Sequence, residues 1–470
     1  MKKAHSMPPQ YQDKYTFSWK FWLWLIAALT VVLIVATLST AWLFRKAQEE
    51  NLSLSGISFS QLVIDFPRFF DKAVQELRSN ISGDPLSQLI DRKLNEKPNW
   101  IRSFPAPADT GYLLLSGIDP EAKRSVVQLI RISDGKRLAL WQPDWSAILD
   151  KGANLHFAFL RSFSALRTMH PLLLDDGDII FNSNDVALIR LSPCSTKPVW
   201  VLNELMHHSN EIDENGLLWT PSFVHDGYSE NPWLQERLSD DALAHVTTDG
   251  VVLEKRSFAR ILRNNGLEAM LMGMFGSSLK TDPLHLNQIQ VALRDSRYWK
   301  RGDLLISARH LSTVFLYRPS SDKIIWYQTG PWMNQHSVDF VDDHRISMFD
   351  NHVVSGAPAE HSFMLPSDTN RVYVYDFETK QVSQPFKTLL AQARPISNSE
   401  GRARVLPDGG LFLEETNYGR DMRFTKDKLL WSRVNDYDKE RIGMVSWSRY
   451  LTAEEASVPL KALTSRQCPE

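Results

Sequence analysis

The pattern of apolar and polar positions first marks a long uncharged run near the start of the chain. Residues Phe21 to Phe44 contain no charged side chain. At about 1.5 Å per residue, a helix of this length exceeds the roughly 30 Å hydrocarbon core of a bilayer. A cleaved signal peptide has a shorter apolar region, usually about 7–15 residues. We therefore expect a transmembrane anchor over residues 21–44.

Basic residues gather on the N-terminal side of this run. They are Lys2, Lys3, Lys14 and Lys20, whereas Arg45 and Lys46 after the run are soon followed by Glu49 and Glu50. An excess of Lys and Arg marks the cytoplasmic flank of a membrane helix. The pattern predicts a single-pass protein of the bacterial inner membrane with residues 1–20 in the cytoplasm and the rest in the periplasm, or outside a cell with one membrane.

After the anchor, apolar residues recur at helical spacing, as at Phe66, Phe69, Val74 and Leu77, with interruptions by proline and glycine. This spacing predicts short helices in a linker over residues 45–104. From about Pro105 the texture changes to short β-rich runs separated by acidic or glycine turns.

One motif recurs through this β-rich region. A polar or small residue precedes an apolar stretch, an acidic or glycine turn, a strand, and a second strand pair that often ends in Trp. The copies begin, in order, at GYLLLSG, MHPLLLDDG, HHSNEIDENG, LHLNQIQ, QHSVDFVDD and GRARVLPDG. Six such copies predict an all-β fold, a six-bladed β-propeller over residues 105–440, followed by a C-terminal tail at 441–470.

A helical insertion separates two of the copies. It lies between Lys255 and Asp282, where RSFARILRNNGLEAMLMGMFG has a Met-rich apolar stripe. Methionine commonly fills irregular gaps in a core. We expect the insertion to cover one side of the propeller, with the stripe serving packing rather than binding.

Composition narrows the possible partners. The 470 residues are 43% hydrophobic and 23% charged, with a formal net charge of −2. Without a strong positive field or a basic stripe, a nucleic-acid partner is not expected. Cys194 and Cys468 are too few for a CxxC pair or a four-thiolate metal site. A disulfide between them and two free thiols both remain open.

Aligning the copies on their turns brings five residues to nearly the same point, the entry to the first strand. They are His170, His208, His285, His336 and Arg402. Because the innermost strands of a propeller line its central channel, these side chains should converge there. Arg309 follows the second strand of the His285 copy and should reach the same mouth.

Two other interpretations of the histidines are available. They could cap blade turns through hydrogen bonds, or form a multi-histidine metal site. An arginine in the set suits an oxyanion better than a metal cation. We therefore expect no bound metal.

These residues also carry a family resemblance. HHSNEIDENG, the HLN motif ending at Asn287, the ISAR motif ending at Arg309, and QHSVDFVDDHRISMFDNH resemble motifs of the bacterial arylsulfate sulfotransferases. The resemblance implies transfer of a sulfuryl group from an aryl sulfate ester to a phenolic acceptor. It further implies a sulfohistidine intermediate, no need for the nucleotide donor PAPS, and no other cofactor.

The same resemblance implies roles for individual residues. His336 would be the nucleophile, and His208, His285 and Arg309 would hold the sulfuryl oxygens and assist proton transfer. Asn287 would contact the substrate or support a residue that does, and His207 could exchange roles with its neighbour His208. His170 and Arg402 complete the predicted substrate-binding residues, as channel-lining positions without a catalytic role.

The chemistry asks for these residue types. Neutral imidazole is a nucleophile near neutral pH, and arginine and histidine donors stabilise charge on the oxygens of a transferring group. The chain also lacks a GxxxxGK[ST] phosphate loop. The resemblance does not extend to the N-terminal part, because the family is expected to have a β-rich domain there instead of an anchor.

The function classes that remain are distinct. An alternative to the enzyme is a non-catalytic, membrane-anchored envelope propeller that binds a glycan or a protein partner. A quinoprotein-like dehydrogenase would need cofactor and calcium ligands that the sequence does not offer. The physiological donor and acceptor and the oligomeric state stay open.

Overall fold

A computed structural model describes residues 101–151, 166–183, 187–224, 240–273, 282–354 and 369–468, with shorter pieces elsewhere. The chain divides into two compact units, Met1–Lys72 and Ala73–Glu470. In the first unit, β1 (Ser53–Leu54) pairs with β2 (Ile57–Ser58). The predicted anchor at residues 21–44 lies, apart from Thr30, outside the described residues. Within the described part of the chain, no helix has the length and apolar character needed to cross a membrane.

The described residues of the second unit form six four-stranded antiparallel sheets, which we call blades 1 to 6. Blade 1 is β7 (Met169–Leu173), β8 (Ile179–Ser183), β9 (Ala187–Leu191) and β10 (Trp200–Leu202); blade 2 is β11 (Glu211–Ile212), β12 (Leu217–Val224), β13 (Asp240–Thr247) and β14 (Val252–Ser257); blade 3 is β15 (Leu286–Val291), β16 (Leu304–Ala308), β17 (Thr313–Arg318) and β18 (Lys323–Thr329). Blade 4 is β19 (Val338–Phe340), β20 (Arg345–Asp350), β23 (Arg371–Asp376) and β24 (Gln381–Ser383); blade 5 is β25 (Arg402–Val405), β26 (Leu411–Glu415), β27 (Arg420–Phe424) and β28 (Leu429–Val434); blade 6 is β30 (Arg449–Leu451), β4 (Tyr112–Asp119), β5 (Arg124–Arg131) and β6 (Arg137–Trp141).

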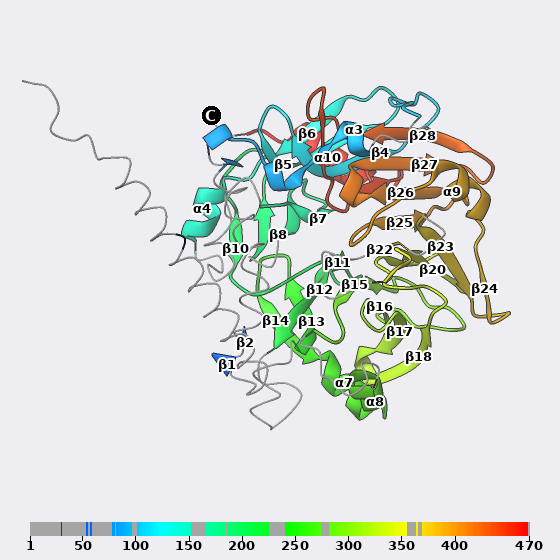
Figure 1. Cartoon of the computed structure of the whole chain (residues 1–470). Coiled ribbons are helices and arrows are strands. Elements are labelled where there is room, and N and C mark those ends of the chain that lie inside the picture. Colours follow the sequence, from blue (N-terminus) through cyan, green and yellow to red (C-terminus); the bar gives the residue numbers. More distant parts are fainter. Residues whose placement is uncertain are drawn as a thin grey trace, which may run out of the picture. The chain divides into compact units, whose positions relative to one another are not determined.

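The blades follow one another around a central axis. In Figure 1 the first strands β7, β11, β15 and β25 lie nearest the centre, and the fourth strands β10, β14, β18 and β24 lie at the outside. The predicted all-β six-bladed propeller is therefore confirmed.

Blade 6 combines strands from the beginning and from the end of the second unit. The repeat pattern predicts a tail over residues 441–470, whereas the structure pairs β30 from that segment with β4, so that Tyr450 lies opposite Leu113. Three strands thus come from the start of the propeller and the innermost one from its end. The ring is closed by antiparallel pairing between distant parts of the chain.

Apolar packing joins each blade to the next. Each of six buried hydrophobic clusters draws residues from two neighbouring blades. Leu114 belongs to the cluster between blades 6 and 1, while its neighbours Leu113 and Leu115 belong to the one between blades 5 and 6. Because successive side chains of a strand point to opposite faces, both faces of a blade are buried. The strand β16 is accordingly buried at every position, and the outer strand β18 alternates between exposed and half-buried positions.

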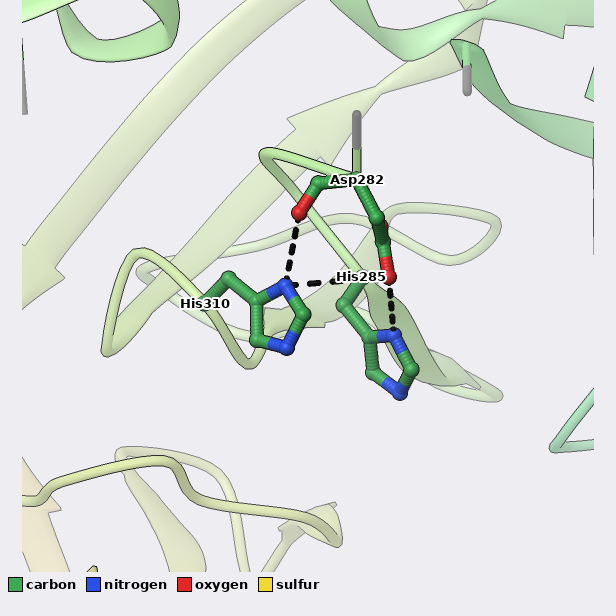
Figure 2. Close-up of side chains that lie close together, drawn as sticks. All are labelled: Asp282, His285 and His310. Atoms are coloured by element: carbon green, nitrogen blue, oxygen red, sulfur yellow. Dashed lines mark hydrogen bonds and ion pairs between the residues drawn. The ribbon is translucent and has the colours of Figure 1, made fainter. Parts of the chain in front are cut away.

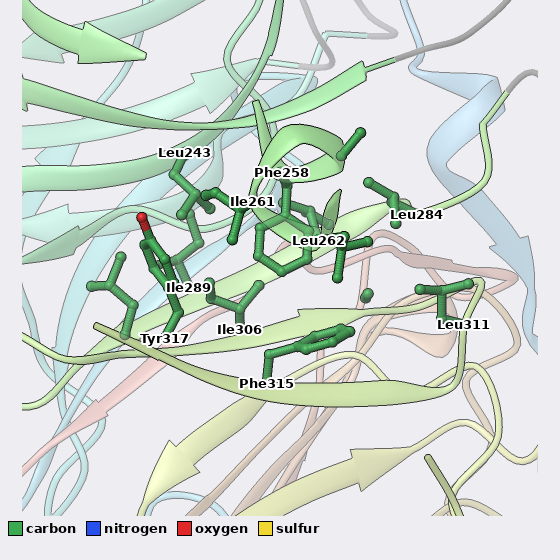
Figure 3. Packing of buried hydrophobic residues seen from close by; sticks show 14 of the residues in the cluster. Leu243, Phe258, Ile261, Leu262, Leu284, Ile289, Ile306, Leu311, Phe315 and Tyr317 are labelled. Carbon is green, nitrogen blue, oxygen red and sulfur yellow. The ribbon is translucent and has the colours of Figure 1, made fainter. Parts of the chain in front are cut away.

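The insertion after blade 2 packs onto the cluster between blades 2 and 3, as Figure 3 shows. Its helix α7 (Phe258–Asn264) begins at Ser257, whose side chain accepts a hydrogen bond from the Arg260 amide. Phe258, Ile261 and Leu262 are buried in the cluster, and Met270 of α8 (Glu268–Gly273) packs against it. Met270 therefore serves packing, as expected from the Met-rich stripe.

The described residues outside the six blades form several short elements. They are the helices α3 (Arg92–Asn95), α4 (Trp145–Asp150), α9 (Lys387–Ala393) and α10 (Ser457–Ser465), the 3-10 turns η1 (Leu86–Gln88), η3 (Pro319–Ser321) and η5 (Thr416–Tyr418), and the paired strands β3 (Leu89–Asp91) with β29 (Arg441–Gly443) and β21 (Val353–Val354) with β22 (Phe363–Met364).

A disulfide between Cys194 and Cys468 settles the alternative left open by the sequence. It ties the chain after α10 to the loop after β9 in blade 1. Arg466 adds a hydrogen bond to Asp178 of the same blade. Blade 6 and blade 1 are therefore joined covalently through the C-terminal segment.

Candidate active site

Left-handed backbone marks the entry to several first strands. His170, His208, His285 and Trp447 have φ values of 48°, 56°, 52° and 60°. Such values are uncommon for residues other than glycine, and they cluster at functional sites. His170 lies in the first strand of blade 1, and the other three lie one to three residues before the first strands of blades 2, 3 and 6.

The ring contacts show that the predicted histidines converge. The ring centroids of His208 and His285 are 5.0 Å apart, and those of His170 and His208 are 6.4 Å apart. Trp447 stacks on His170 at 4.3 Å and lies 6.4 Å from His336. Histidines from blades 1, 2 and 4 therefore contact one tryptophan, and His285 of blade 3 contacts His208 beside it.

Trp447 is a site residue that sequence reasoning missed. It is 1% exposed, and the Arg167 guanidinium lies 5.5 Å from its ring centroid. Trp447 precedes β30, the first strand of blade 6, which lies far in sequence from the other three strands of that blade. A search for a sixth first strand near the C-terminus would have identified the WSRYL segment.

The position of the proton on His336 follows from Asn351. The two are 2.6 Å apart, from His336 Nδ1 to Asn351 Oδ1. The Asn351 amide nitrogen donates to the backbone carbonyls of Ser397 and Glu400, each at 2.8 Å, and this identifies the other amide atom as oxygen. His336 Nδ1 must then carry the hydrogen, and Nε2 presents a lone pair.

His336 is held neutral. It is 2% exposed, and burial lowers its pKa well below the usual value. The charge of Arg309 lowers that pKa further, against a smaller opposing effect of Asn351. An unprotonated imidazole is the nucleophilic form.

Arg309 is fixed by its neighbour in the chain. Its Nη1 lies 2.8 Å from His310 Nε2. Because arginine can only donate, His310 Nε2 accepts and His310 Nδ1 carries the hydrogen, which it donates to the Asp282 backbone carbonyl at 2.7 Å. Burial, followed by the charge of His285, lowers the pKa of His310 to about 4. His310 is therefore a neutral bridge between Arg309 and Asp282.

The Asp282 side chain binds His285, as Figure 2 shows. His285 Nδ1 lies 2.6 Å from Asp282 Oδ2, and the His285 ring stacks on His310 at 4.5 Å. Burial acts to raise the pKa of Asp282, but the hydrogen bond and charge of His285 bring it down to about 2. The ionised carboxylate thus faces Nδ1–H and leaves His285 Nε2 for a substrate.

Asp282, His285 and His310 are also the residue types of a metal site, with ligand atoms within 4.8 Å of one another. Both nitrogens of His310 and Nδ1 of His285 are already used in hydrogen bonds. Arg309 also places a fixed cation on His310. The donor set therefore favours a hydrogen-bonded array over a metal centre.

His207 and His208 occupy different places. Their Nδ1 atoms are 2.8 Å apart, and His207 Nε2 lies 3.2 Å from Asp241 Oδ1. His208 contacts His170, His285 and Trp447, whereas His207 stacks on Phe223. Desolvation, then His285 and His207, lowers the pKa of His208 well below its usual value. This geometry favours His208 as the residue at the channel mouth and His207 as its support.

The other predicted substrate residues differ in their surroundings. Asn287 is buried, and its amide nitrogen donates to the Gln335 carbonyl at 2.8 Å, next to His336. Burial lowers the pKa of His170 well below its usual value, and neither of its ring nitrogens has a hydrogen-bond partner among the described residues. Arg402 lines a separate cavity and lies 3.7 Å from Glu211.

Comparison with known proteins identifies a family match over the region that holds this site. A family model described as arylsulfotransferase (ASST) matches residues 170–435. No curated protein matches the chain.

Several solved structures resemble the chain at low sequence identity. A Bacteroides caccae protein of unknown function is 12% identical, with a TM-score of 0.43, and the match covers 73% of this chain and 99% of that one. A periplasmic gluconolactonase of Pseudomonas aeruginosa is 11% identical, with a TM-score of 0.37 and the same two coverages of 73% and 99%. A streptogramin B lyase is 10% identical, with a TM-score of 0.36 and coverages of 76% and 89%.

Proposed function

Because the chain belongs to the arylsulfotransferase (ASST) family, we propose that it moves a sulfuryl group from an aryl sulfate ester to a phenolic acceptor through sulfated His336, without PAPS. The observation that carries the proposal is the hydrogen bond from His336 Nδ1 to Asn351, which leaves Nε2 as a lone-pair nitrogen. Arg309 is close enough for its charge to lower the pKa of His336, after burial.

In the first half-reaction, the Nε2 lone pair of His336 attacks the sulfur of the donor. The new S–N bond forms as the S–O bond to the aryl group breaks, and the phenolate leaves with that electron pair. His285 enters this step as an imidazolium, and its Nε2–H proton passes to the phenolate oxygen, which leaves His285 neutral. In the second half-reaction, the acceptor phenol gives its proton back to His285, its oxygen attacks sulfur, and the S–N bond breaks to restore neutral His336.

Arg309 supplies charge stabilisation for the sulfuryl oxygens. One of its N–H groups is used by His310, and Arg309 Nε is buried without a partner among the described residues. A guanidinium has five N–H donors in a planar fork, so donors remain for the transferring group. Preorganised donors of this kind stabilise a transition state whose charge is spread over equatorial oxygens.

Of the two channel histidines His208 and His285, His285 is better placed to carry a proton. The Asp282 carboxylate accepts from His285 Nδ1–H and would stabilise the imidazolium. His208 instead bonds to another imidazole, and its pKa is lowered by desolvation and by nearby histidines. We assign proton transfer to His285 and oxygen binding to His208.

The cellular location is part of the proposal. The apolar run from Phe21 to Phe44 and its basic N-terminal flank support an inner-membrane anchor with the propeller in the periplasm. Protease added to spheroplasts should digest the propeller and spare a tag at the N-terminus. A protected propeller would exclude this orientation.

The test of function is turnover of a fluorogenic aryl sulfate with phenol as acceptor. The purified chain should release the fluorophore with ping-pong kinetics, and donor alone should leave one sulfuryl group on His336 by peptide mass spectrometry. His336→Ala should lose both signals. His344→Ala is the matched control, because His344 lies in the same segment and is bonded to Asp343 on the surface.

Absence of turnover and of sulfated peptide with several donors would overturn the enzyme assignment. The propeller would then be a non-catalytic binding scaffold for a glycan or a protein. Retention of full turnover in His336→Ala would instead exclude His336 as the nucleophile.

A further inference from the structure

A cluster of charged side chains crosses the channel below the histidines. Glu211 of β11 accepts two hydrogen bonds from Arg449 of β30, each at 3.0 Å, and one from Gln288 of β15 at 3.3 Å. Arg449 also donates to the Pro171 carbonyl at 2.7 Å. First strands from blades 1, 2, 3 and 6 therefore meet at Glu211.

A cavity of about 270 Å³ lies beside this cluster. Its lining comes from later positions of the first strands than the histidines do: Ile212 follows His208, and Gln290 follows His285. First strands of a propeller run in the same direction along the channel. The cavity therefore lies toward the channel mouth opposite the histidines, and we call it the distal cavity.

Arg402 lines the distal cavity without a matched partner. It is 7% exposed, and its Nη1 has no hydrogen-bond acceptor among the described residues. The Glu211 oxygen at 3.7 Å is its nearest ion-pair contact in the described part of the chain, and that carboxylate is already bound by Arg449. A buried guanidinium with unused donors is costly, so an acceptor is expected in the cavity.

Arg402 shares the neighbouring carboxylates Glu211 and Asp339 with the other arginines of the cavity. Arg404 is paired with Glu455 through both carboxylate oxygens. Burial raises the pKa of Asp339, another lining residue, to about 6. Burial and the charge of Arg449 lower the pKa of Arg402 to about 10, as expected for a desolvated cation near a like charge.

The rest of the distal cavity offers an apolar wall. Leu172, Ile212, Phe412 and Leu451 contribute to its lining. A pocket with apolar walls and one unmet polar group fixes an amphipathic ligand by that group. A small ion alone would use the guanidinium and leave the apolar surface uncovered.

We propose that the distal cavity binds a small organic acid, whose single carboxylate or sulfate group accepts hydrogen bonds from Arg402 and whose apolar body packs against Leu172 and Phe412. This site is separate from His336 and takes no part in sulfuryl transfer. Both head groups are planar or tetrahedral oxyanions that suit the guanidinium fork.

Calorimetric titration of the full chain with benzoate tests the carboxylate form. Titration of the His336→Ala chain with phenyl sulfate, compared with His336→Ala that also carries Arg402→Gln, tests the sulfate form without turnover, because the active site would bind phenyl sulfate equally in both. At least one should bind. Benzamide, which has the same shape without the charge, should not. Arg309→Gln should leave benzoate binding unchanged, whereas Arg402→Gln should weaken it about tenfold or more, the range expected for loss of a charge-assisted hydrogen bond.

Leu172→Trp should also abolish binding, because it fills the distal cavity and removes no charge. It keeps the test decisive if Arg402→Gln fails to fold. Arg256→Gln is a surface control and should bind as the unaltered chain does. Equal binding of benzamide, loss of binding in Arg309→Gln with retention in Arg402→Gln, or no binding of either acid would overturn the proposal. None of these outcomes bears on turnover at His336.

Discussion

His336 donates its Nδ1 hydrogen to Asn351 Oδ1 across 2.6 Å, and Asn351 is itself held by two backbone carbonyls. The amide therefore selects one tautomer of the buried imidazole. The orientation of the nucleophile depends on a residue that never needs to contact the substrate.

Replacing Asn351 tests this dependence. Asn351→Leu should lower kcat by about 10²–10⁴-fold, because a wrong tautomer removes the Nε2 lone pair. Asn351→Asp restores the acceptor but adds a negative charge that raises the pKa of His336. In a plot of kcat against pH, the fall in activity on the acidic side should therefore begin at a higher pH in Asn351→Asp. A variant that had only lost packing around Asn351 would not show this shift.

The link between His310 and Arg309 is testable through a conservative change. His310→Leu should reduce kcat/KM by about 10–10²-fold, the range expected when a catalytic donor is misplaced. His310→Gln should recover much of the loss, since one amide can accept from Arg309 and donate to the Asp282 carbonyl. Equal activity of the two variants would exclude a positioning role for His310.

Asp282→Asn should affect donors according to their leaving groups. The neutral amide would not stabilise a protonated His285, so aryl sulfates of weakly acidic phenols should lose about 10²-fold or more in kcat. Donors with acidic leaving groups need little protonation and should be far less affected. A uniform loss across the donor series would contradict proton transfer by His285.

The buried neutral histidines make stability depend on pH in a defined direction. Burial lowers the pKa of His170, so between that value and about 6.5 the unfolded chain binds a proton that the folded chain does not. Stability contributed by His170 is therefore present above pH of about 6.5 and is lost as pH falls below it. His170→Phe should flatten the dependence by up to about 1.4 kcal/mol per pH unit in urea unfolding.

The measured quantity is the difference in pH dependence of stability between His170→Phe and the unaltered chain, because other buried groups also titrate in this range. Burial raises the pKa of Asp240 and Asp339 to about 6, and these carboxyls act in the opposite sense. Their contributions cancel when the variant is subtracted from the unaltered chain. An unchanged slope in His170→Phe would show that His170 is protonated in the folded state.

Removing the disulfide should weaken the C-terminal closure. Cys194→Ser with Cys468→Ser should lower the free energy of unfolding by about 2–5 kcal/mol. Unfolding of the unaltered chain under reducing conditions should show the same decrease. A loss confined to α10, with no change in the main unfolding transition, would show that the disulfide secures the helix alone.

The propeller could be predicted because, in five of the six copies, the first strand directly precedes the other three strands of its blade in the sequence. The copy at GYLLLSG has no polar entry residue of its own, since β30 supplies that strand from Arg449 to Leu451. Pairing between residues so distant leaves no local signal. For the same reason Trp447 was missed while His208 and His285 were found.

The sequence identified many of the residues of the candidate site, but few of the contacts that they make with one another. Asp282 and His310 flank known motifs, but their roles depend on a turn that brings both to one imidazole. Arg402 shares the sequence position of the histidines, yet its long side chain lines the distal cavity. The position of a residue in the repeat predicts where its backbone lies in the blade. It does not predict which cavity a long, flexible side chain reaches.

The pairing of β30 with β4 also has a consequence during biosynthesis. The edge of β4 has no partner until residues near 450 have been synthesised, when nearly the whole propeller has already emerged. An unpaired edge strand is a template for association with other chains. Truncation just before β30 should therefore yield a chain that aggregates, even though each of the other five blades retains all four of its strands.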